Sequence, residues 1–105
     1  MYTALGRLWL EHASLTDRVA IDKALEALEP AASRPTATSE TLALYGRALL
    51  LSGNTEAAVR TLQQATARAP VEPLAYRYLS EAATQVRDSS IARDADIRYA
   101  ALTEP

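Results

Sequence analysis

The sequence predicts an all-α fold built from antiparallel helical hairpins, and three observations support this class. Hydrophobic residues make up 49% of the composition but aromatic residues only 6%, so the strong helix formers Ala and Leu fill most apolar positions. Only three Gly and five Pro are present, too few for the regularly spaced turns of a β-sandwich or barrel. Apolar residues also recur at three- and four-residue steps, which is the spacing of one helix face. A chain of 105 residues should form one domain, 1–105, with one modest core.

Composition also argues against several classes of function. The formal net charge is −2 and acidic and basic residues are interleaved, so we expect no nucleic-acid partner. The absence of Cys excludes disulfides, thiol catalysis and thiolate metal ligands. No stretch approaches the ~18 apolar residues of a membrane span, and the first residues do not resemble a signal peptide. We therefore expect a soluble protein without membrane insertion, and we favour the cytoplasm.

The clearest hairpin lies at 39–72. A first helix is predicted near 39–51, because its large apolar residues form one stripe. Gly53 can adopt the left-handed conformation that ends this helix, and Asn54 can cap the free amides of the next one. Pro70 is expected to end the second helix, because proline cannot continue the hydrogen-bond ladder. The two stripes consist of Leu42, Tyr45, Gly46 and Leu49, then of Ala58, Leu62 and Ala65.

This pattern resembles the tetratricopeptide repeat, a 34-residue helical hairpin with a Leu-Gly pair, an Ala-x3-Phe motif and a closing Pro. The resemblance implies a right-handed α-solenoid of about three hairpins. It also implies that Gly46 and Ala58 allow the two helix backbones to approach closely. Leu42 replaces the Trp of the family, Tyr45 its Leu, and leucines its Tyr and Phe, so each change keeps an apolar residue.

Two further copies of the repeat are predicted. An irregular copy at 1–29 places Gly6 on the position of Gly46, and a Pro/Ser/Thr-rich linker at 30–38 follows it. A third copy at 73–103 begins with Pro73, which is tolerated at a helix start. Strict repeat spacing would place Asp96 on the large apolar position of its second helix. Either the turn is about three residues longer or the helix has drifted, and we favour the longer turn. The packing residues predicted in these copies are Gly6, Tyr76, Leu79, Ala95 and Tyr99, with Leu102 on the same face as the last two.

The resemblance also implies a binding surface on the first helix of each hairpin. Arg7 and Arg47 both follow the repeat glycine, and Arg77 should lie near the same surface. Their guanidinium groups could bind carboxylates or carbonyl oxygens of a peptide in a concave groove, although an ordinary solvated helix surface would carry the same residues. The Lys/Asn clamp of some family members is not present. Further groove candidates are Ala43, Leu50 and Glu81.

We therefore predict a scaffold for protein–protein interaction, with another protein or a peptide as its partner. The alternative is a structural or oligomerisation segment of a larger protein with no groove ligand. Ile97 is predicted to lie opposite the packed face of the last helix, which suggests continuation of the array or self-association through an end repeat.

No catalytic, cofactor-binding or metal-binding residue is predicted, and we expect no enzyme. His12 is the only histidine and has no convergent partner. Asp94 and Asp96 point about 200° apart on a helix, so they cannot act as a pair. Ser89 and Ser90 have no nearby histidine and are better explained as helix caps.

Overall fold

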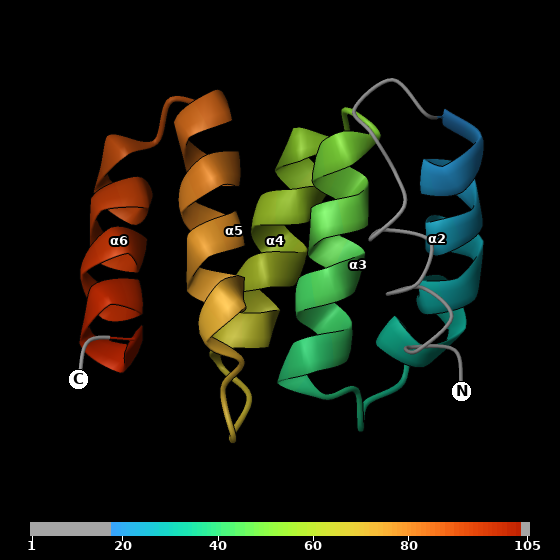
Figure 1. Ribbon diagram of the computed structural model, residues 1–105, viewed down its shortest axis with the longest axis horizontal. Helices are drawn as coiled ribbons and strands as arrows, with labels where there is room; N and C mark the ends of the chain where they lie inside the picture. The colour runs from blue at the N-terminus through green and yellow to red at the C-terminus, as the bar shows by residue number, and fades with distance from the viewer. Residues whose placement is uncertain (1–17, 104–105) are drawn as a thin grey trace.

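The computed structural model describes residues 18–103, and all regular structure in this part of the chain is α-helical. Successive helices pack antiparallel into a compact globule (Figure 1). The predicted all-α class is therefore confirmed. None of the helices in the described range is long and apolar enough to cross a bilayer. The five helices are α2 (Arg18–Ala32), α3 (Ser39–Leu51), α4 (Thr55–Thr66), α5 (Pro73–Gln85) and α6 (Ser89–Thr103).

Two hairpins, α3–α4 and α5–α6, repeat with the same register. The first helix starts at Ser39 in one hairpin and at Pro73 in the other, which is one repeat length further along the chain. The second helices start at Thr55 and Ser89, which are separated by the same interval. The turns of the two hairpins are thus equally long, and the longer turn that we predicted for the second hairpin is wrong. Each hairpin packs internally, and α5 also contacts both α3 and α4 (Figure 1).

Gly53 ends α3 in the left-handed conformation that we predicted for it. Gly53 has φ +91°, a conformation that favours glycine. The backbone N–H groups of Gly53 and Asn54 donate to the carbonyls of Leu50 at 3.1 Å and Leu49 at 3.0 Å, which satisfies two free helix-end carbonyls. The side chain of Asn54 makes no capping hydrogen bond, contrary to our prediction.

The second turn has the same hydrogen-bond pattern without a glycine. Arg87 occupies the position equivalent to Gly53 and has φ 63°, and the N–H of Asp88 donates to the carbonyl of Ala83 at 2.8 Å. The carboxylate of Asp88 then accepts from the N–H of Ile91 at 3.1 Å. Asp88 therefore caps α6, and the capping role predicted for Ser89–Ser90 is wrong because both already lie inside the helix.

Helix α6 is turned about its axis relative to α4. The position equivalent to Leu62 is Asp96, yet Asp96 is exposed and the neighbouring Ala95 is buried with 1% exposed area. Burial of an unpaired carboxylate costs several kcal/mol, so a rotation of about one residue, or ~100°, avoids that cost. Leu102, which we placed on the packed face, remains 47% exposed. Helix α6 has 15 residues and α5 only 13, so α6 is two residues longer than its partner.

The two helices of the first hairpin approach closely at Gly46. A Cβ atom at this position would lie 2.5 Å from Leu62 Cγ and 2.6 Å from Leu62 Cδ2. Leu62 and Ala58 are fully buried. The side chain nearest to the glycine is that of Leu62, and the predicted close approach of the two helices at Gly46 is confirmed.

The other predicted packing residues are distributed as follows. Leu42, Leu49, Ala65, Leu79 and Ala95 are buried, while Tyr45, Tyr76 and Tyr99 are partly buried. Gly6 lies outside the described residues.

Ser39 links three segments at one end of the hairpins. Its hydroxyl donates to the carbonyl of Ala65 at 2.7 Å and accepts from the N–H of Glu72 at 2.8 Å. Helix α4 ends early, at Thr66, close to the carbonyl of Ala65 that Ser39 binds. The N–H groups that follow donate to carbonyls three residues back rather than four, as at the end of a helix. Pro70 is exposed and lies beyond the helix, so it does not end α4 as we predicted.

The predicted linker at 30–38 is partly helical. Helix α2 continues through Pro30 to Ala32, and the N–H of Ser33 still donates to the carbonyl of Glu29 at 2.9 Å. Pro30 has no N–H to donate to the carbonyl four residues back, so this turn of α2 lacks one hydrogen bond. The connector between α2 and α3 is therefore shorter than expected.

Gly46→Ala should lower the free energy of unfolding by up to about 2 kcal/mol. Overpacking against Leu62 costs about 1–3 kcal/mol, and the better helix propensity of Ala offsets roughly 1 kcal/mol of it. Denaturant unfolding of both single variants and the double variant checks this. Leu62→Ala alone should lower the free energy of unfolding by about 2–5 kcal/mol. In the Leu62→Ala background Gly46→Ala should be neutral or stabilising, and an unchanged penalty there would contradict the close contact.

Ser39→Ala should lower the free energy of unfolding by about 1–3 kcal/mol, because the Glu72 N–H loses its partner and the Ala65 carbonyl loses its side-chain donor. Ser90→Ala is the matched control, since Ser90 is exposed and should change stability by less than about 0.5 kcal/mol. Equal effects of the two substitutions in denaturant unfolding would show that the Ser39 bridge is not structural.

Candidate functional site

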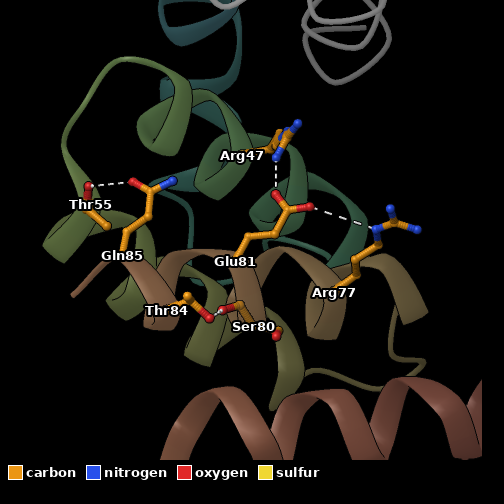
Figure 2. A network of polar contacts seen from close by, with 7 residues as sticks. All are labelled: Arg47, Thr55, Arg77, Ser80, Glu81, Thr84 and Gln85. Carbon is orange, nitrogen blue, oxygen red and sulfur yellow. Dashed lines mark hydrogen bonds and ion pairs between the residues drawn. The ribbon is translucent and has the colours of Figure 1, made fainter. Parts of the chain in front are cut away.

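The candidate site lies where α3 and α5 pack side by side. Arg47 comes from α3, and Arg77, Tyr78 and Glu81 come from α5. We call these four residues the arginine face. Figure 2 shows that the side chains of Arg47 and Arg77 point toward Glu81 from two sides. Both hairpins are therefore needed to form this face.

Glu81 binds both guanidinium groups at once. Arg47 Nη1 donates to Glu81 Oε2, and Arg77 Nε lies 3.8 Å from Glu81 Oε1 (Figure 2). The exposed fractions of the side chains are 30% for Arg47, 39% for Glu81 and 59% for Arg77. Arg47 is thus held tightly within the fold, whereas most of the Arg77 side chain faces solvent.

Tyr78 supports Arg47 from a second direction. The guanidinium carbon of Arg47 lies 5.2 Å from the centre of the Tyr78 ring, within cation–π range. Burial raises the pKa of Tyr78 above its ordinary value of 10.0, and the nearby positive charge of Arg47 opposes that rise. Arg47 is therefore fixed by a carboxylate and an aromatic ring on the neighbouring hairpin.

Arg77 remains a permanent cation at the edge of the face. The nearby Tyr99 hydroxyl of α6 raises the pKa of Arg77, and the Glu81 carboxylate also raises it. The Arg47–Glu81–Arg77 cluster carries a net charge of one positive unit. The face can thus attract an anionic or hydrogen-bond-accepting group.

The repeat register explains why these residues meet. Arg47 and Glu81 are 34 residues apart and occupy equivalent positions on the first helices of the two hairpins. Stacked helices bring equivalent positions together, so opposite charges at this spacing are a signal that the sequence contains. We did not predict the contact of Arg47 with Tyr78, because no spacing rule relates those two residues.

Two predicted groove residues are not available for binding. Ala43 has 1% and Leu50 has 6% of its area exposed. Both belong to the apolar cluster that also contains Ala75 and Ala82 of α5. They are buried because the stripe of α3 that carries them packs against α5. Arg7, a third candidate, lies outside the described residues, as does His12.

A weaker polar contact lies at the far end of the same surface. The Thr55 hydroxyl donates to Gln85 Oε1 at 3.5 Å, and the Thr84 hydroxyl donates to the carbonyl of Ser80 at 2.8 Å (Figure 2). The first contact joins the start of α4 to the end of α5. In the described range no three His, Cys, Asp or Glu side chains are placed to hold a metal ion.

No protein-family model matches the chain, and no curated protein or solved structure matches it.

Stability should fall as the pH rises above 10, and Tyr78 should cause part of the fall. The pKa of Tyr78 is raised in the fold, so the folded state favours the protonated side chain. This preference contributes fully to the free energy of unfolding below pH 10.0, and the contribution is lost as the pH rises through the folded pKa. Tyr78→Phe should weaken the alkaline loss of unfolding free energy, measured by denaturant unfolding between about pH 8 and 12. An identical pH profile for the variant would contradict the assignment.

Proposed function

We propose that this chain is a tetratricopeptide-like repeat module that binds a segment of another polypeptide across the arginine face. The shared register of the two hairpins supports the repeat assignment. So do the tight contact of Gly46 with Leu62 and the packing of α5 against both helices of the preceding hairpin. In a right-handed solenoid of this type the first helices line the concave side, where a partner segment binds.

The binding proposal rests on one observation: Arg47 is engaged by neighbouring side chains, whereas most of Arg77 is exposed. Arg47 is engaged by Glu81 and Tyr78, so its main role is to join the hairpins. Arg77 exposes 59% of its side chain, and its ion-pair contact with Glu81 is long, at 3.8 Å. A guanidinium carries five donors in a planar fork, so Arg77 keeps donors for a carboxylate or a backbone carbonyl beside its long contact with Glu81.

Assembly through the end of the array is a second candidate function. Ile97 has 62% of its area exposed on the outward side of α6. In repeat proteins such a surface is normally covered by the next hairpin. This reading requires no ligand on the arginine face.

Arg77→Glu reverses the charge of the exposed arginine and should weaken peptide binding at least about tenfold. The probes are 12-residue random peptides, displayed on phage and selected against the purified chain, then synthesised and titrated by fluorescence anisotropy. Arg98→Glu is the matched control. Arg98 also exposes 59% of its side chain and pairs with a carboxylate four residues away, but it lies on α6.

The expected result is a loss with Arg77→Glu and little change with Arg98→Glu. Selected peptides that bind both variants as tightly as the parent chain would exclude the arginine face as the binding site. Equal losses for both variants would show a general charge effect and would also contradict the proposal.

A further inference from the structure

The outer face of α6 has no neighbour in the described part of the chain. Helix α6 packs only against α5 there, and it lies at the end of the row of helices (Figure 1). Ile97 has 62% of its area exposed on this face. A shallow hollow of about 370 Å³ lies beside it and is lined by Ser89, Ser90, Arg93, Asp94 and Ile97. One helix thus presents both an exposed apolar side chain and a hollow next to it.

Two charged residues next to Ile97 have no partner of opposite sign. Arg93 lies one helical turn before Ile97, and Asp96 directly precedes it. Both side chains are exposed, and neither takes part in an ion pair among residues 18–103. A further hairpin that stacked an apolar surface on α6 would bury both charges unpaired, which is unfavourable. The face therefore fits a partner with matching charges better than an apolar one.

A second copy of the same helix supplies the matching charges. In an antiparallel pair of α6 helices related by a two-fold axis, every contact between two different residues occurs twice. If Arg93 lies opposite Asp96 of the second copy, the axis passes midway between these two positions along each helix. Ile97 then lies at the level of Ala92 of the second copy, which is the middle of the hollow. One register therefore pairs the charges and also fills the hollow.

We propose that the protein forms a weak two-fold dimer through antiparallel pairing of the outer faces of α6. This inference rests on the assembly function proposed above, and it names the partner as a second copy of this chain. Arg93 and Asp96 form an ion pair on each side of the axis, and each Ile97 packs into the hollow of the other copy. The two Asp94 carboxylates lie near the axis, and each is neutralised by Arg98 of its own chain at 3.0 Å.

The dimer is weak because a single helix of each chain forms the interface. Such an interface falls below the ~1,200 Å² of buried area that specific, stable complexes reach. The ion pairs are exposed, so they set the register and orientation of the helices more than they add affinity. We therefore expect a dissociation constant in the high micromolar to millimolar range, with monomers in dilute solution.

Sedimentation equilibrium from micromolar to millimolar chain concentrations measures the dissociation constant. Ile97→Asp should weaken the dimer at least about tenfold, because it places a charge in the hollow beside Asp94. Val19→Asp is the matched control and should leave the dissociation constant unchanged. Val19 has 68% of its area exposed, but it lies on α2 at the opposite end of the row of helices (Figure 1). Circular dichroism should show both variants to be folded, since both positions are exposed.

Charge substitutions test the register of the pair. Arg93→Glu and Asp96→Arg should each weaken self-association about tenfold at low ionic strength, because each places like charges opposite one another. The double variant Arg93→Glu/Asp96→Arg should recover the affinity of the parent chain. An equimolar mixture of the two single variants should recover it as well, because their charges are complementary. These differences should shrink at about 1 M salt.

A parent chain that stays monomeric up to millimolar concentration would overturn both the inference and the assembly function. Self-association that Ile97→Asp does not weaken would leave an assembly function but overturn α6 as its surface. Single charge variants that dimerise as tightly as the parent chain, or that their combination does not restore, would overturn the antiparallel register. The peptide-binding function is tested separately, since the phage-selected peptides should bind Ile97→Asp as tightly as the parent chain.

Discussion

The contact of Gly46 with Leu62 sets the distance between α3 and α4, and the rest of the fold depends on it. With no Cβ on Gly46, the buried Leu62 side chain reaches the backbone of α3. The two helices then pack closely enough to form one surface on which α5 lies against both. That placement brings the stripe of α3 that contains Arg47 next to α5, so the arginine face is a consequence of the first hairpin's packing.

The second hairpin keeps the register of the first but not its interior. Its helices start at equivalent positions and its turn has the same hydrogen bonds, although Arg87 replaces the glycine. Ser80 and Asp96 stand where the first hairpin has Gly46 and Leu62. Because a carboxylate cannot replace a buried leucine, α6 rotates and buries Ala95 instead. Backbone register and side-chain packing are therefore specified separately in this chain. The residues of the turns set the register of the helices, and the size and polarity of the facing residues set the packing.

If the proposed binding function holds, the arginine face joins stability to recognition. Arg47 holds the two hairpins together through Glu81 and Tyr78, while Arg77 shares the same carboxylate and stays open to solvent. A partner that draws on these donors necessarily acts on the contact between hairpins. Such coupling follows from the placement of the cluster at the boundary of two repeats, because no single hairpin contains it.

The sequence alone determined the all-α class, the bounds of α3 and the start of α5, since helical periodicity and the positions of Gly53 and Pro73 depend on local interactions. It also placed Arg47, Arg77 and Glu81 on related helix positions. Only the tertiary structure decided that Ala43 and Leu50 are buried, that α4 ends before Pro70, and that α6 turns Asp96 outward. These outcomes depend on which surfaces meet, on the Ser39 bridge and on the cost of burying a charge, and none of those is a property of a single segment. Opposite charges one repeat length apart are visible in the sequence, but only stacking of the hairpins makes them neighbours.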